Sequence, residues 1–230
     1  AALLGKAAAL WLPSGTMANQ VALRVLTRPG DEVLTAREAH AGWHEAGGAA
    51  ANAGVQIVEP KKFGDERGYF IENYRREWFP QGREMIQGNR GNRIAGCLVG
   101  LHYHLHQADY WYVPFGHARV VLHDLRQGSP TDGATQVLDL GEVDGGENNH
   151  LGIFIPPGVA HGFASLSDMA ITYLVDGYYN PADENGVAWN DPAVDADWGL
   201  TDPILSARDQ ANPLRTELDP MFQPHYQLRP

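Results

Sequence analysis

Short apolar runs, each followed by a turn signal, fill the chain from about Val58 onward and restrict its fold more than any other feature. The runs alternate in polarity or are rich in β-branched residues, and they cover residues 119–125, 135–140, 151–155 and 169–175. Turn-forming stretches lie between and after them, at residues 129–133, 144–149 and 180–183. Strands separated in this way are typical of antiparallel sandwiches and barrels. The sequence therefore predicts a mainly β domain over residues 58–230.

The first 57 residues differ from the rest in composition and in apolar spacing, and they predict a short α/β segment. They are rich in Ala and Gly, and Met17, Val21 and Val25 recur at the four-residue spacing of one helix face. Ser14 is a suitable first residue for this helix. We place the domain boundary at residue 57, where the helical periodicity ends. Because the chain lacks an initiator Met, we expect it to start within a longer reading frame.

Charge and cysteine content exclude several classes of partner. The chain has 17 basic and 28 acidic side chains and a formal charge of -11, which disfavours broad contact with a nucleic-acid backbone. Its one cysteine, Cys97, excludes an internal disulfide framework. No apolar run reaches the roughly 18 residues that a membrane helix needs. We predict a cytoplasmic protein that binds neither nucleic acid nor membrane.

The N-terminal segment carries the motifs LPSGTMANQ (12–20), RPGDEV (28–33) and EAH (38–40), and it resembles the PLP-dependent threonine aldolases. The resemblance implies that residues 14–16 meet the phosphate of PLP at a helix start and that His40 lies near the pyridine ring. The simpler alternative is that Ser14 caps a helix and His40 is a surface residue. The lysine that would hold PLP as a Schiff base has no counterpart after residue 58. We therefore expect neither PLP nor aldolase activity.

Six separated motifs in the remaining sequence resemble the dTDP-4-dehydrorhamnose 3,5-epimerase family. They are EPKKFGDERGYF (59–70), GLHY (100–103), PPGVAHGF (156–163), YYNP (178–181), WNDP (189–192) and LSARD (205–209). The resemblance implies a cupin-type jelly-roll β-sandwich that forms a homodimer and holds a nucleotide-linked sugar inside the barrel. It also implies an isomerase that inverts C3, C5 or both in a 4-keto-6-deoxy sugar, without a required cofactor.

Three residues match the family's catalytic positions. His102 matches the base, and an imidazole with a pKa near neutrality suits proton abstraction at physiological pH. Asp209 matches the carboxylate that orients this histidine, and Tyr173 matches the acid that returns a proton to the opposite face. Without the resemblance, the alternatives are a structural strand histidine, a surface ion pair with Arg208 and a core tyrosine.

Five further residues match positions that bind substrate in the family. Arg67, Glu72, Gln87 and Asn89 match positions that hold the nucleotide and the sugar, and a guanidinium facing a diphosphate suits a net-acidic protein. His161 matches a pocket histidine that supports the sugar. As isolated polar residues, the first four carry no functional signal, and the Pro-Pro-Gly turn before His161 could equally serve the fold alone.

The sequence departs from the family at three positions near the expected chemistry. Val99 replaces the arginine before the Gly-Leu-His motif, and His104 replaces a glutamine. Asp109 stands where a lysine is expected to stabilise the enolate oxygen, and a carboxylate there opposes the developing negative charge.

These departures open two alternative functions. The pattern His102-x-His104-x4-Asp109 with His161 downstream suits zinc, iron, manganese or nickel, so a metal-dependent cupin enzyme with these four ligands is one alternative. A metal would then replace the lost cations as Lewis acid. The other alternative is a non-catalytic sugar-nucleotide-binding module.

Overall fold

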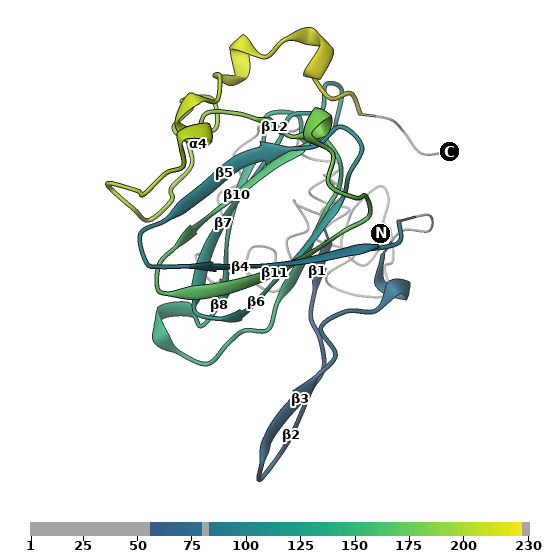
Figure 1. Ribbon diagram of the computed structural model, residues 1–230, viewed down its shortest axis with the longest axis vertical. Helices are drawn as coiled ribbons and strands as arrows, with labels where there is room; N and C mark the ends of the chain where they lie inside the picture. Colours follow the sequence, from purple (N-terminus) through teal and green to yellow (C-terminus); the bar gives the residue numbers. More distant parts are fainter. Residues whose placement is uncertain (1–55, 80–82, 227–230) are drawn as a thin grey trace, which may run out of the picture. The chain divides into compact units, whose positions relative to one another are not determined.

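The computed structural model describes residues 56–79 and 83–226, and their strands form two five-stranded antiparallel sheets and one hairpin (Figure 1). The first sheet has the order β1 (Gln56–Val58), β9 (Gly152–Ile155), β6 (Asp109–Phe115), β11 (Met169–Val175) and β4 (Gln87–Arg93). The second has the order β12 (Asn185–Gly186), β5 (Leu98–Tyr103), β10 (Val159–Ser165), β7 (His117–Asp124) and β8 (Thr135–Gly141). This is the cupin-type jelly roll that the family resemblance implies.

Helical structure in the described residues is confined to short turns. They are η2 (Arg76–Trp78), η3 (Val143–Gly145), η4 (Pro181–Asp183), α4 (Ala207–Ala211), η5 (Arg215–Glu217) and η6 (Pro220–Phe222). The predicted helix with Met17, Val21 and Val25, and the PLP-related positions Ser14 and His40, lie outside the described residues.

The main core lies between the two sheets and follows from the two-residue period of the strands. On β6, Trp111 and Val113 point into this core, whereas Tyr110 and Tyr112 pack on the opposite face. The strands β7 and β10 of the second sheet complete it from the other side. Because both faces of β6 are buried, its apolar run is nearly continuous, as expected for a fully covered strand.

Both outer faces are also covered. The C-terminal segment, residues 187–226, packs Val194, Trp198 and Leu218 against Leu101 and Val121 of the second sheet. Figure 1 shows this segment in yellow-green beside β5 and β12. On the first sheet, Phe79 and its neighbours cover the outer aromatic side chains of β6. The C-terminal segment therefore contributes to the core of the β domain.

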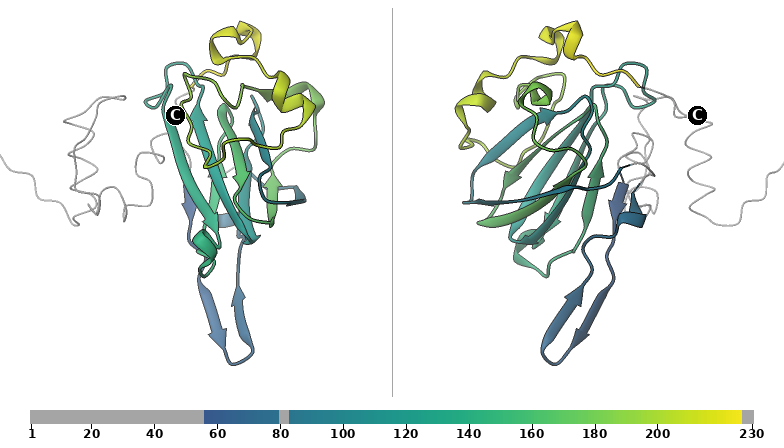
Figure 2. Two further views of the ribbon diagram at one scale, coloured as in Figure 1. Left: turned by 90° about the vertical axis from the view of Figure 1, so that its left-hand side faces the viewer. Right: turned by 45° about the vertical axis from the view of Figure 1, so that its right-hand side comes forward.

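A hairpin of β2 (Lys62–Asp65) and β3 (Gly68–Ile71) projects beyond the two sheets (Figures 1 and 2). Phe63, Tyr69 and Phe70 on it are 48%, 52% and 63% exposed. Such a concentration of exposed aromatic side chains is typical of a surface that contacts a partner.

Glycines bring β5 and β10 unusually close beside the predicted catalytic histidine. A Cβ on Gly162 would lie 2.7 Å from the Val99 carbonyl oxygen, and one on Gly100 would lie 2.7 Å from the His161 carbonyl oxygen. Gly100 also has a φ of +111°, which favours glycine. In this register His102 and His161 stand opposite each other across the two strands.

Candidate active site

A cavity of about 430 Å³ lies between the two sheets. Its walls come from both sheets and from the segments that follow β11. The lining residues are Gln87, Asn89, Gly91, Arg93, Val99, His102, His104, Gln107, Asp109, Trp111, His161, Phe163, Ile171, Tyr173, Val175, Tyr179, Glu184 and Arg208. Both apolar and polar side chains line the cavity, which is the usual composition of a small-molecule site.

His102 and Asp209 form a hydrogen-bonded pair at this cavity. The distance from His102 Nε2 to Asp209 Oδ1 is 2.6 Å, and the Ser206 hydroxyl donates to Asp209 Oδ2 at 2.8 Å. Burial acts to raise the pKa of Asp209, but the hydrogen bonds from His102 and Ser206 outweigh it and hold this pKa below its ordinary value. The carboxylate therefore stays charged and can orient the imidazole.

Tyr173 enters the cavity from the other sheet. It lies on β11, where its neighbours across the strands are Asn89 on β4 and Trp111 on β6. Burial, assisted by the charge of Asp109, raises the pKa of the Tyr173 phenol. The hydroxyl therefore keeps its proton at neutral pH and is available as a donor.

The predicted substrate-binding residues fall into two groups. Gln87 and Asn89 line the cavity and hydrogen-bond to each other at 3.1 Å, and His161 lines it from β10. Arg67 and Glu72 are not among the lining residues. The Arg67 side chain lies at the tip of the hairpin, 85% exposed and paired with Asp65, and Glu72 accepts a hydrogen bond from Arg75 at 2.7 Å.

His104, Asp109 and His161 form a buried cluster in the cavity. The distances are 3.8 Å from His104 Nε2 to Asp109 Oδ1 and 3.9 Å from His161 Nε2 to Asp109 Oδ2. Burial lowers the pKa of His161 to about 4, although the charge of Asp109 opposes this shift. Potential ligand atoms of these three residues lie within 4.8 Å of one another, and His102 is not part of this group.

Residues that the sequence analysis did not assign to the site also line the cavity. Arg93 belongs to the same face of β4 as Gln87 and Asn89, which follows from the two-residue period of a strand only once β4 is known to be one. Arg208 and Glu184 form an ion pair with an N–O distance of 3.0 Å at the rim. The cavity therefore contains two guanidinium groups, although Val99 and Asp109 replace the cations expected at their positions.

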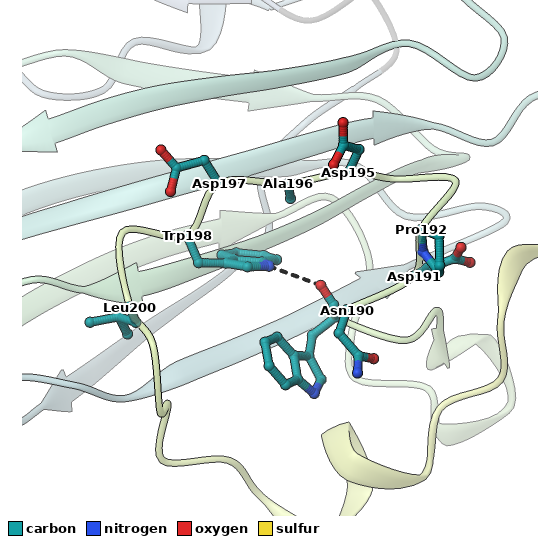
Figure 3. A pocket seen from close by; sticks show the side chains of 9 residues that line it. Asn190, Asp191, Pro192, Asp195, Ala196, Asp197, Trp198 and Leu200 are labelled. Atoms are coloured by element: carbon teal, nitrogen blue, oxygen red, sulfur yellow. Dashed lines mark hydrogen bonds between the residues drawn. The ribbon is translucent and has the colours of Figure 1, made fainter.

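A second cavity, of about 290 Å³, lies within residues 189–200 (Figure 3). The Trp198 indole donates a hydrogen bond to the Trp189 carbonyl oxygen at 2.8 Å across this stretch. Asp195 and Asp197 point away from the Trp198 ring in Figure 3. The ionisable residues that line this cavity are three aspartates, and no histidine, tyrosine, arginine or lysine lines it.

In the part of the chain that the structure describes, no helix combines the length and hydropathy that crossing a bilayer would require.

Family models match both parts of the sequence. The model described as dTDP-4-dehydrorhamnose 3,5-epimerase matches residues 50–217. A second model, described as beta-eliminating lyase, matches residues 1–74, which fits the aldolase-like segment that the sequence analysis identifies.

Curated relatives carry the same epimerase name. The dTDP-4-dehydrorhamnose 3,5-epimerase of Neisseria gonorrhoeae is 38% identical over 164 residues, which are 68% of this chain and 48% of that relative. The chain thus spans about half the length of this relative. The enzyme of the same name from Shigella flexneri is 36% identical over 163 residues, which are 67% of this chain and 87% of that relative.

Solved structures agree with these relatives in fold and family. The dTDP-6-deoxy-D-glucose-3,5-epimerase of Legionella pneumophila, in complex with dTDP-4-keto-L-rhamnose, has a TM-score of 0.69 and 34% identity and covers 76% of this chain and 94% of its own. A 3'-monoepimerase of Streptomyces bikiniensis, in complex with dTDP-quinovose, has a TM-score of 0.67 and 29% identity. It covers 75% of this chain and 90% of its own. The chain therefore belongs to the dTDP-4-dehydrorhamnose 3,5-epimerase family.

Proposed function

We propose that this chain is a sugar-nucleotide isomerase that inverts C3, C5 or both in a dTDP-linked or related 4-keto-6-deoxy sugar. The observation that carries the proposal is the pairing of His102 with Asp209 in a cavity that Tyr173 enters from the opposite sheet. The ligands named for the Legionella and Streptomyces relatives support a nucleotide sugar as the substrate class.

The arrangement of the two sheets suits inversion. His102 belongs to β5 of the second sheet and Tyr173 to β11 of the first. A sugar ring held between the sheets meets the base on one face and the acid on the other. A proton removed from one face and returned to the opposite face inverts the carbon.

The His102–Asp209 pair has the properties that a general base needs. The ketone at C4 acidifies the protons at C3 and C5, and His102 removes one of them to give an enolate. The charged Asp209 then stabilises the resulting imidazolium and fixes the ring orientation. Tyr173, which keeps its proton because its pKa is raised, returns a proton to the carbon.

Side chains on β4 are suited to hold the nucleotide and the sugar. Gln87, Asn89 and Arg93 share one face of this strand and line the cavity. The amides can bind sugar hydroxyls, and the Arg93 guanidinium can bind a phosphate oxygen. Arg208 at the rim is a second candidate for the diphosphate.

The projecting hairpin supports the prediction of a homodimer. Arg67 and Glu72 match substrate-binding positions of the family but do not line the cavity of their own chain. The exposed Phe63, Tyr69 and Phe70 would be buried if the hairpin packed on a second copy. In such a dimer, the hairpin would deliver Arg67 and Glu72 to the neighbouring cavity.

We assign this function to the β domain, predicted from the sequence as residues 58–230, whose first strand β1 begins two residues earlier at Gln56. In this proposal the aldolase-like segment before that strand, predicted as residues 1–57, is a separate, non-autonomous fragment, and the location in the cytoplasm remains a prediction.

The test is solvent exchange into the substrate. The full chain is incubated with dTDP-4-keto-6-deoxyglucose in D2O, and deuterium at C3 and C5 is followed by NMR. We expect exchange with the unaltered chain and none with His102→Asn. His106→Asn is the matched control, because His106 is exposed and does not line the cavity.

The outcomes separate the remaining functions. Exchange that persists in His102→Asn contradicts the assignment of the base. Binding of the nucleotide sugar without any exchange would instead identify a sugar-nucleotide-binding module.

A further inference from the structure

We propose that His104, Asp109 and His161 bind a divalent transition-metal ion in the cavity. The three side chains come from different parts of the sandwich. His104 follows β5, Asp109 begins β6 and His161 lies on β10. Their exposed fractions are 5%, 4% and 5%, so the fold itself positions all three potential ligands.

The orientation of both imidazoles favours metal binding. His104 Nδ1 lies 2.8 Å from the carbonyl oxygen of Asp183, and His161 Nδ1 lies 2.9 Å from that of Val159. A carbonyl oxygen only accepts, so each Nδ1 carries a proton and donates it. Nε2, the nitrogen nearer Asp109, is therefore the ring atom left to act as a metal ligand. Histidine ligands in metal sites are oriented by hydrogen bonds of this kind.

The distances leave room for an ion between the ligand atoms. At 3.8 Å and 3.9 Å, the nitrogen and oxygen atoms are too far apart for a direct hydrogen bond. Two ligand atoms on a tetrahedral metal with bonds of about 2.1 Å are about 3.4 Å apart. A contraction of a few tenths of an ångström would bring each imidazole–carboxylate pair to this separation, and all three ligand atoms already lie within 4.8 Å of one another.

The carboxylate of Asp109 needs a positive charge. It is buried, and in the described residues the basic side chains within 4 Å of its oxygens are the two imidazoles and no lysine or arginine. Gln107 Nε2 donates to Oδ1 at 2.9 Å and Trp111 Nε1 donates to Oδ2 at 3.1 Å. These neutral donors orient the carboxylate but leave its charge uncompensated, and a buried charge without a counter-charge is costly.

Two imidazoles and one carboxylate suit zinc, iron or a similar divalent ion and leave coordination positions open. The three ligands line the same cavity as His102 and Tyr173. An oxygen of a bound ligand could occupy an open position, where the ion would act as a Lewis acid. This last step rests on the proposed function, because it takes the ketone oxygen of the sugar as that ligand, whereas metal binding itself does not.

The test measures metal binding without substrate. The full chain, purified without chelator or a histidine tag, is analysed by inductively coupled plasma mass spectrometry. Chelator-treated protein is then titrated with Zn²⁺ by calorimetry and with Co²⁺ by absorption spectroscopy. We expect one ion per chain and Co²⁺ d–d bands typical of nitrogen and oxygen ligands.

Variants assign the ligands. Asp109→Asn keeps the shape of the side chain and should weaken Zn²⁺ binding by about 100-fold or more, since loss of even an outer hydrogen-bond partner of a ligand costs about 10- to 100-fold. His104→Gln should weaken Zn²⁺ binding by a similar factor. Agreement between the two variants would show that the loss of affinity is not caused by a folding defect in one of them. His117→Gln is the matched control, because His117 is a buried histidine beside a carboxylate, Asp139, outside the cavity.

The result separates this site from the proposed function. His102→Asn should retain the metal and lose deuterium exchange. If the unaltered chain binds metal but does not exchange deuterium, the metal site stands and the proposed isomerase function is contradicted. A chain that exchanges deuterium but binds neither Zn²⁺ nor Co²⁺ overturns the metal site, as does an Asp109→Asn variant with unchanged Zn²⁺ affinity.

Discussion

Asp124, at the end of β7, should be one of the most sensitive positions for stability. It is 2% exposed. Arg126 donates to Oδ1 from its backbone nitrogen at 3.0 Å and from Nε at 2.8 Å, and to Oδ2 from Nη2 at 2.7 Å. The hydroxyls of Ser129 and Thr131 donate to Oδ2, each at 2.6 Å. One carboxylate therefore organises the connection from β7 to β8.

The substitution Asp124→Asn replaces one acceptor oxygen by an amide group that faces other donors. The two hydroxyls can rotate towards new acceptors, but the buried guanidinium of Arg126 loses the negative charge of Asp124. Removing one partner of a buried pair costs about 3–5 kcal/mol. Because asparagine keeps one acceptor oxygen, we expect the free energy of unfolding to fall by roughly 3 kcal/mol, measured by urea denaturation of the full chain.

The pH dependence provides a second readout. Burial acts to raise the pKa of Asp124, but its hydrogen bonds outweigh this effect and lower the pKa below its ordinary value. The stabilisation is therefore complete above the unfolded-state pKa and is lost as the pH falls through the lower folded-state pKa. The stability difference between the unaltered chain and Asp124→Asn should shrink as the pH falls below about 4.

The matched control is Asp132→Asn, in the same connection. Asp132 pairs with Arg215 at 2.5 Å, but the two side chains are 35% and 26% exposed, and such surface pairs contribute about 0–1 kcal/mol. The reasoning is refuted if both substitutions cost the same, or if the difference for Asp124→Asn does not change between neutral and acid pH.

Two further predictions concern the cavity. Asp209→Asn should lower kcat by roughly 10- to 100-fold with little change in KM, because a charge-assisted hydrogen bond contributes about 1.5–3 kcal/mol. Steady-state kinetics measure both constants, and an unchanged kcat would contradict the orienting role of Asp209. Gly162→Ala should destabilise the fold by about 1–3 kcal/mol, because its Cβ would lie 2.7 Å from the Val99 carbonyl oxygen. Urea denaturation measures this, and Gly64→Ala, whose nearest contact is 3.7 Å, should be nearly neutral.

The strands were predictable from the sequence where apolar residues carried the signal. The predicted runs 119–125, 135–140, 151–155 and 169–175 correspond to β7, β8, β9 and β11. The sequence of β4, by contrast, is Gln-Gly-Asn-Arg-Gly-Asn-Arg. It has no apolar periodicity, because one face lines a polar cavity. Edge strands of this kind are specified by their neighbours, and no local pattern could reveal β4.

The site was partly predictable. The expected pairing of His102 with Asp209 is present at 2.6 Å, although only the family resemblance linked two residues so far apart in the chain. The expected cluster of His104, Asp109 and His161 also forms, but His102 lies outside it. The location of Arg67 depends on where the hairpin points, which residue patterns alone do not determine.

The distance along the chain between His102 and Asp209 also affects when the chain can become active. The two residues are 107 positions apart, and they meet only where α4 packs beside β5. During synthesis the β-strands leave the ribosome before Asp209 does, so the sandwich can form while His102 still lacks its carboxylate. A nascent chain, or one cleaved before residue 205, would therefore have a cavity in which Asp209 does not orient His102. Isomerase activity would then show that the C-terminal part of the chain has folded.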